Sequence, residues 1–112
     1  MSRSEKRKYK RLPITLDLSC HKAGSTMEEF YTGRTVNVGP GGLYFETATG
    51  VFKPGNLLKV DLSIPPTTGL LEFGGRISGL VRVLRTCNID DSLLSAKYGV
   101  AVEFCQSPKL SM

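Results

Sequence analysis

The chain is organised as short segments in which apolar and polar residues alternate. In the first of them, Ile14, Leu16 and Leu18 fall on one face and the intervening polar residues fall on the other. A period of two residues is typical of a β-strand with one buried face. The segments with this pattern are 13–20, 30–38, 43–46, 58–64, 73–86 and 98–104. No window longer than about two turns has convincing helical periodicity, so we predict an all-β protein.

Glycine, proline and small polar residues separate these segments, at 24–25, 39–42, 54–55, 65–66 and 88–92. Such clusters are typical of turns, and 92–97 has room for one turn of helix. Six strands at this spacing predict a small six-stranded antiparallel β-barrel, because closing the sheet removes exposed strand edges. We divide the chain into a flexible basic N-terminal arm at 1–11, the barrel at 12–106 and a C-terminal tail at 107–112.

The length and the apolar runs set the broad class of the protein. The chain has 112 residues, which is enough for one domain. Its apolar runs are far shorter than the ~20 residues of a membrane-spanning helix. The charged N-terminus has no apolar stretch behind it, unlike a secretory signal peptide. We therefore expect a cytoplasmic protein without membrane insertion.

Residue types that carry catalysis or metal binding are sparse. Cys20, Cys87 and Cys105 are widely spaced and form no C-x-x-C pair, so neither a zinc site nor a disulfide framework is indicated. The single histidine, His21, adjoins Cys20, and neighbours on a strand point to opposite faces. No carboxylate pair or nucleophile–base couple is visible. The sequence predicts a protein that is not an enzyme and holds no metal or cofactor.

The excess positive charge lies at one end of the chain. The net charge is +5, from 15 basic and 10 acidic residues. Six of those basic residues and only one acidic residue lie in 1–11, so the rest of the chain is neutral. A segment of this kind has too little apolar surface to fold alone. It is either a solvated, disordered tail or an arm that becomes ordered on an anion.

The arm carries two arginines four residues apart, Arg7 and Arg11, directly before the first strand. A planar guanidinium can donate two parallel hydrogen bonds to a phosphate or to O6 and N7 of guanine, and it can stack on a base. Two such groups suit a ligand with two phosphates and two guanines. Arg3 and Arg7 have the same spacing, but Arg11 lies at the root of the first strand, where the barrel can hold it.

The second local feature is the segment 37–42, Asn-Val-Gly-Pro-Gly-Gly. Glycines permit left-handed backbone conformations and let a ligand or another chain approach closely. The N–H groups of such a turn can form a concavity for phosphate, and the Asn37 amide can both donate and accept. Taken alone, the segment is better explained as an ordinary β-turn between two strands.

Together and in this order, the two features resemble the PilZ family of bacterial cyclic di-GMP receptors, with its motifs Arg-x-x-x-Arg and [Asp/Asn]-x-Ser-x-x-Gly. Arg7 and Arg11 match the first motif, and Asn37 and Gly42 match the ends of the second. The resemblance extends over about residues 5–105 and includes the strand patterns at 41–46, 79–83 and 98–104. It implies a six-stranded barrel that holds the ligand between the N-terminal arm and the outer surface.

The resemblance further implies that cyclic di-GMP orders the arm on the barrel. The ordered arm would create a surface for a separate protein partner, which the sequence does not identify. The expected ligand-binding residues are the two arginines, the two lysines that flank the first of them, and residues of the glycine-rich turn: Lys6, Arg7, Lys8, Arg11, Asn37, Gly39, Gly41 and Gly42.

One position departs from the family pattern, because Gly39 stands where the second motif has serine. Losing that hydroxyl costs ~0.5–1.5 kcal/mol for a neutral hydrogen bond and ~1.5–3 kcal/mol for one to a charged group. These values correspond to a ~2-fold to ~150-fold loss of affinity. The alternative function is therefore a ligand-independent PilZ-like adaptor that binds another protein.

Binding to DNA or RNA is not expected. Proteins that bind single-stranded nucleic acid present several exposed aromatic side chains on a basic groove. In this chain the residues after the arm are neutral overall, and Tyr9, Tyr31 and Tyr44 are scattered singly.

Overall fold

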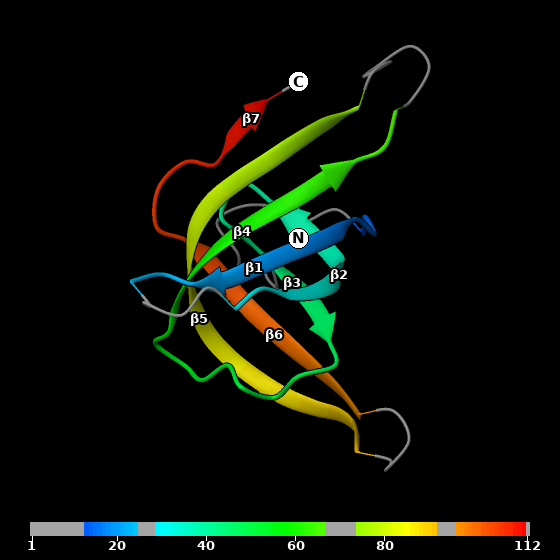
Figure 1. Cartoon of the computed structure of the whole chain (residues 1–112), viewed down its shortest axis with the longest axis vertical. Coiled ribbons are helices and arrows are strands. Elements are labelled where there is room, and N and C mark those ends of the chain that lie inside the picture. The colour runs from blue at the N-terminus through cyan, green and yellow to red at the C-terminus, as the bar shows by residue number, and fades with distance from the viewer. Residues whose placement is uncertain (1–12, 25–28, 67–73, 92–95, 112) are drawn as a thin grey trace, which may run out of the picture.

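The computed structural model describes residues 13–24, 29–66, 74–91 and 96–111 (Figure 1). The described residues form strands and no helix, and therefore contain no helix long and apolar enough to cross a membrane. The strands are β1 (Asp17–Lys22), β2 (Tyr31–Gly39), β3 (Gly42–Thr47), β4 (Leu57–Ile64), β5 (Gly75–Asp91), β6 (Ala96–Phe104) and β7 (Lys109–Ser111).

The sheet closes on itself. Its strand order is β4-β1-β2-β3-β6-β5-β7, and β4 also pairs with β5. All of these pairings are antiparallel. Because β4 pairs with both β1 and β5, strands β1 to β6 form a closed barrel, which confirms the predicted fold. Residues 109–111, expected to lie in a tail, form β7 and pair with the outer edge of β5 at 76–78. Figure 1 shows β7 running beside the end of β5 that pairs with β4.

Strand β5 is longer than its sequence pattern indicated. A turn was expected at 88–92, but β5 continues to Asp91, with shifts of register near Leu84 and Ile89. Cross-strand pairing explains the extension, because residues 85–91 find partners in residues 96–101 of β6. Residues 96 and 97, proposed as part of a helical turn, belong to β6, and 92–95 lie outside the described residues.

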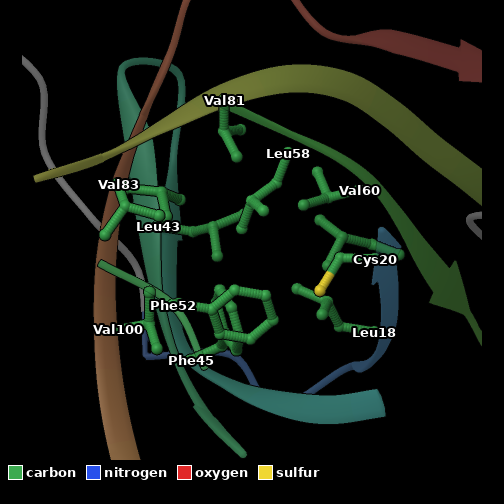
Figure 2. Close-up of a cluster of buried hydrophobic side chains, with 12 residues drawn as sticks. Leu18, Cys20, Leu43, Phe45, Phe52, Leu58, Val60, Val81, Val83 and Val100 are labelled. Atoms are coloured by element: carbon green, nitrogen blue, oxygen red, sulfur yellow. The ribbon is translucent and has the colours of Figure 1, made fainter. Parts of the chain in front are cut away.

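The core is filled by the inward-facing side chains of the six barrel strands and by Phe52 from the β3–β4 connection (Figure 2). Phe52 meets Phe45 and Tyr31 edge to face, with ring centroids 6.2 and 5.3 Å apart. Burying such side chains contributes ~1.5–3 kcal/mol each, so this core is the main source of stability. The buried core residues are Leu18, Cys20, Leu43, Phe45, Phe52, Leu58, Val60, Leu62, Val81, Val83, Val100 and Val102.

A β-bulge in β2 changes which side chains face the core. Thr35 pairs with Phe45 of β3, but the next paired residue is Asn37, which leaves Val36 as the extra residue. The alternating pattern had placed Val36 and Val38 on the same face. In the structure Val36 is 39% exposed, whereas Val38 packs against the core. A bulge re-aims the residues that follow it, and here it turns Asn37 to the outer surface.

Candidate functional site

The glycine-rich motif forms the hairpin that joins β2 to β3. Asn37 pairs with Tyr44, Val38 with Leu43, and Gly39 with Gly42. Leu43 is fully buried, so the pairs on either side of it face outward. Asn37 and Gly39 therefore lie on one strip of the outer surface, whereas Gly42, the partner of Gly39, is buried. The Asn37 side-chain oxygen is buried there without a hydrogen-bond partner among the described residues.

The turn itself consists of Pro40 and Gly41, and the barrel fixes its position. The Phe104 N–H donates to the Gly41 carbonyl at 2.9 Å, which ties the turn to the end of β6. The motif glycines are not among those with positive φ, which in the described residues are Gly24, Gly55 and Gly74. The motif glycines therefore do not use the left-handed conformations that glycine permits.

Residue 42 has to be glycine because another segment of backbone lies close to it, and that segment is β6 of the barrel itself. A β-carbon on Gly42 would overlap the Val102 carbonyl oxygen and come within 3.0 Å of the Glu103 Cα. This glycine is needed because β6 packs directly against β3 at this point. The space in front of Gly42 is thus occupied by protein backbone.

Thr35 anchors the segment that leads to the N-terminal arm. Its hydroxyl donates to the Ile14 carbonyl at 2.6 Å and accepts from the Leu16 N–H at 2.7 Å. The Thr35 N–H also donates to the Leu16 carbonyl at 3.0 Å. These bonds hold residues 14–16 against β2, directly before the bulge that turns Asn37 outward. A lone threonine in an alternating strand gives no sign of this role, and the sequence analysis missed it.

An apolar hollow of about 290 Å³ lies between this anchored segment and the turn. Ile14 forms one part of its wall, and Gly39 and Pro40 form another. The remaining lining residues are Val38, Ile77, Phe104 and Pro108. The hollow therefore includes one residue of the predicted site, Gly39, and lies beside the segment that follows the arm in the sequence.

A larger hollow, of about 640 Å³, lies over β1, β2 and β3 away from the turn. Its charged lining residues form two ion pairs, Arg34–Asp17 at 3.2 Å and Lys97–Glu46 at 3.7 Å. Positive and negative charges are balanced in this hollow. It has no excess charge with which to attract the dianionic ligand expected from the sequence.

The outer strip continues from the hairpin across the barrel. Tyr44 lies opposite Ala101 of β6, which lies opposite Arg85 of β5, so Asn37, Tyr44, Ala101 and Arg85 form one row. The Tyr44 hydroxyl lies 3.4 Å from the Cys87 sulfur. This hydrogen bond, together with partial burial, raises the pKa of Tyr44 to about 12. Tyr44 is therefore uncharged at neutral pH.

The structure brings together the predicted site residues of the hairpin. Asn37, Gly39, Gly41 and Gly42 lie in or next to one turn. The predicted residues of the arm, Lys6, Arg7, Lys8 and Arg11, lie outside the described residues, and their part in the site remains a prediction. Outward-facing Tyr44 and Arg85 were not predicted as site residues, because their place beside Asn37 depends on strand pairing.

Four ion pairs join eight of the described charged side chains of the barrel. Besides the two ion pairs of the larger hollow, Arg76 pairs with Asp61 at 3.6 Å and Arg82 with Glu103 at 3.2 Å. The pairs are exposed and contribute little stability. They do, however, neutralise much of the surface. Among the described residues Arg85 forms no ion pair, so it is a free positive charge on the outer strip.

These features define a small closed antiparallel barrel with a polar strip beside its β2–β3 hairpin. The PilZ domain model matches residues 5–109, and the chain therefore belongs to the PilZ domain family. This result confirms the resemblance inferred from the motifs.

The fold is also similar to the Bacillus subtilis inhibitor of motility (MotI/DgrA), with a TM-score of 0.71 and 23% identity. That match covers 92% of this chain and 44% of the other, so the chain spans less than half the length of this structural relative. No curated protein matches the sequence.

Proposed function

We propose that the protein is a cyclic di-GMP receptor whose ligand orders the N-terminal arm against the β2–β3 hairpin. The observation that carries this proposal is the register of the hairpin. It places Asn37 and Gly39 on one outer strip, beside the segment anchored by Thr35. Membership of the PilZ domain family supports the same conclusion.

The position of the anchored segment makes the arm arginines available to this strip. Arg11 lies three residues before Ile14, so their Cα atoms are at most ~11 Å apart. Arg7 lies seven residues before Ile14 and can extend to at most ~25 Å. Both guanidinium groups can therefore reach a ligand that rests on Asn37 and the turn.

Charge explains why the arm is needed. Cyclic di-GMP carries two phosphates, whereas the residues after the arm are neutral overall and include four ion pairs. The six basic residues of 1–11 supply the missing positive charge. Arg7 and Arg11 can donate forked hydrogen bonds to phosphate or guanine, and Lys6 and Lys8 add charge beside them.

The proposed effect of ligand binding is a new protein surface. Ordering of a segment by a ligand is a known type of molecular switch. The arm, once packed on the barrel, forms a surface that the free protein lacks, and we propose that a separate protein recognises it. The protein thus acts by binding and catalyses no reaction.

The ligand-independent adaptor is the second candidate, and Gly39 favours it. Gly39 faces outward on the strip but has no side chain to offer a ligand. The missing hydroxyl weakens a dinucleotide site by the ~2-fold to ~150-fold derived above. A site of high affinity tolerates this loss, whereas a weak site does not.

Isothermal titration with cyclic di-GMP at physiological salt, with GTP as the control ligand, separates the two candidates. The receptor binds cyclic di-GMP selectively at micromolar affinity or better, and the titration also gives the stoichiometry. Arg7→Ala and Arg11→Ala should each nearly abolish binding without lowering the melting temperature of the free protein. Arg76→Ala is the matched control, because it removes an exposed arginine far along β5. Absence of binding up to about a millimolar cyclic di-GMP would rule out the receptor and leave the ligand-independent adaptor as the remaining candidate.

A further inference from the structure

Tyr44 lies along the outer surface of the barrel and spans three strands. Its Cα belongs to β3, and its hydroxyl meets the Cys87 sulfur of β5 at 3.4 Å. Between them lies Gly99 of β6, where an added β-carbon would overlap the Tyr44 hydroxyl and lie 3.1 Å from that sulfur. The tyrosine side chain can cross β6 only because residue 99 has no side chain.

This arrangement holds the Tyr44 ring in one place without burying it fully. The hydroxyl end is fixed by Cys87, and the side chain remains partly exposed. The Tyr44 Cα lies opposite that of Asn37, its partner in the β2–β3 pairing. An aromatic side chain held in place beside the candidate site is a ready surface for a flat ligand group.

Arg85 completes the row at its far end. It is separated from Tyr44 by Ala101 alone, so the two Cα atoms are about two strand spacings, or ~10 Å, apart. Ala101 carries only a methyl group between them and is 3% exposed. The charge of Arg85 acts on the Tyr44 hydroxyl, where it opposes the rise in pKa caused by Cys87.

We propose that Tyr44 and Arg85 form a base-recognition surface, on which one guanine of the dinucleotide rests against the Tyr44 ring and presents its O6 and N7 to Arg85. This inference rests on the proposed function. It assigns the outer faces of β3, β6 and β5 to the ligand, in addition to the arm and the hairpin. A guanidinium forks well to O6 and N7 of guanine, whereas adenine has an amino donor in place of O6.

The test is titration of the full chain with cyclic di-GMP and cyclic di-AMP. Tyr44→Leu removes the ring and keeps an apolar cover over Gly99; Tyr44→Phe keeps the ring and loses the hydroxyl contact. Stacking is worth ~1–3 kcal/mol per base, so Tyr44→Leu should weaken cyclic di-GMP binding ~5-fold to ~150-fold, and Tyr44→Phe far less. Tyr31→Leu is the matched control, because Tyr31 packs against the core through Phe52.

The Arg85→Ala variant tests the edge contact. It should weaken cyclic di-GMP binding and so narrow the preference over cyclic di-AMP, by ~5-fold to ~150-fold for a bidentate contact of about 1–3 kcal/mol. Arg76→Ala should leave both affinities unchanged. A second readout is direct: the Tyr44 ring signals in NMR spectra should shift upfield when cyclic di-GMP is added, and those of Tyr31 should not.

The outcomes separate the two proposals. Wild-type binding that depends on Arg7 and Arg11 but is unchanged in Tyr44→Leu and Arg85→Ala would overturn this inference alone. Ring signals of Tyr44 that do not move at saturating ligand would do the same. A wild-type protein that binds no cyclic di-GMP would overturn the proposed function and this inference with it.

Discussion

The anchor between Thr35 and the segment 14–16 leads to a quantitative prediction. Thr35→Val replaces the hydroxyl by a methyl group of nearly the same size, at a position that is 2% exposed. It removes two hydrogen bonds, to the Ile14 carbonyl at 2.6 Å and from the Leu16 N–H at 2.7 Å. At ~0.5–1.5 kcal/mol each, their loss should lower the free energy of unfolding by about 1–3 kcal/mol.

Thr47→Val is the matched control for this substitution. Thr47 is 6% exposed, and its hydroxyl donates a single hydrogen bond, to the Thr32 carbonyl at 2.8 Å. Thr47→Val should lower the free energy of unfolding by only ~0.5–1.5 kcal/mol. Urea unfolding followed by circular dichroism measures both variants, and an unchanged m-value shows that the shift in midpoint reports stability.

Thr35→Val should also weaken the binding of cyclic di-GMP, because Thr35 holds the segment that leads to the arm. The Leu16 carbonyl keeps its bond to the N–H of residue 35, but the Ile14 carbonyl is released, and ligand binding then has to order additional backbone at ~1–2 kcal/mol per residue. Ordering even one such residue weakens cyclic di-GMP binding ~5-fold to ~30-fold. Thr47→Val should leave the affinity unchanged. Equal losses of stability in the two variants, or equal affinities, would refute the role given to Thr35.

Three further predictions concern the glycine motif and the cysteines. Gly39→Ser should tighten cyclic di-GMP binding within the ~2-fold to ~150-fold range, and an unchanged titration would show that Gly39 is not simply a missing contact. Gly42→Ala forces its methyl group into the Val102 carbonyl and should cost at least ~1–3 kcal/mol of unfolding free energy in urea; a neutral result would contradict the packing of β3 on β6. Burial raises the pKa of Cys20 from 9.0 to about 12, so its contribution to stability is complete below pH 9 and is lost between pH 9 and 12 as the unfolded thiol ionises. A thiol reagent at pH 8 should accordingly modify exposed Cys87 and leave Cys20 unmodified, and rapid modification of Cys20 in the folded protein would argue against its burial.

Much of the fold follows from the alternation of apolar and polar residues, because each barrel strand has one face in the core. The pattern located all six barrel strands and the breaks between most of them. It failed where pairing between distant segments decides the outcome. Strand β5 continues to Asp91 because β6 supplies a partner, and no local signal marks that partner. Strand β7 is three residues long and exposed, and only its pairing with β5 defines it.

The bulge in β2 shows a second limit. Threonine and valine both suit a strand, so Thr35, Val36 and Val38 fit a regular alternation as well as a bulged one. Only the structure shows that Thr35 faces inward, where its hydroxyl satisfies two backbone groups of the preceding segment. The outward position of Asn37 is a consequence of that choice. The sequence identified the residue types of the candidate hairpin, and tertiary pairing sets their direction.

The division of charge between arm and barrel bears on how the proposed receptor would distinguish its ligand. If the barrel carried the positive charge, any phosphate-rich molecule could bind to it without the arm, and binding would not change the shape of the protein. Here the described ion pairs neutralise much of the barrel surface, and six basic residues lie in 1–11. A ligand can then gain the full electrostatic attraction only by bringing the arm onto the barrel, because phosphate contacts supply affinity and contacts to base edges supply specificity. In the proposed receptor, recognition of the ligand and the change of surface are thereby the same event.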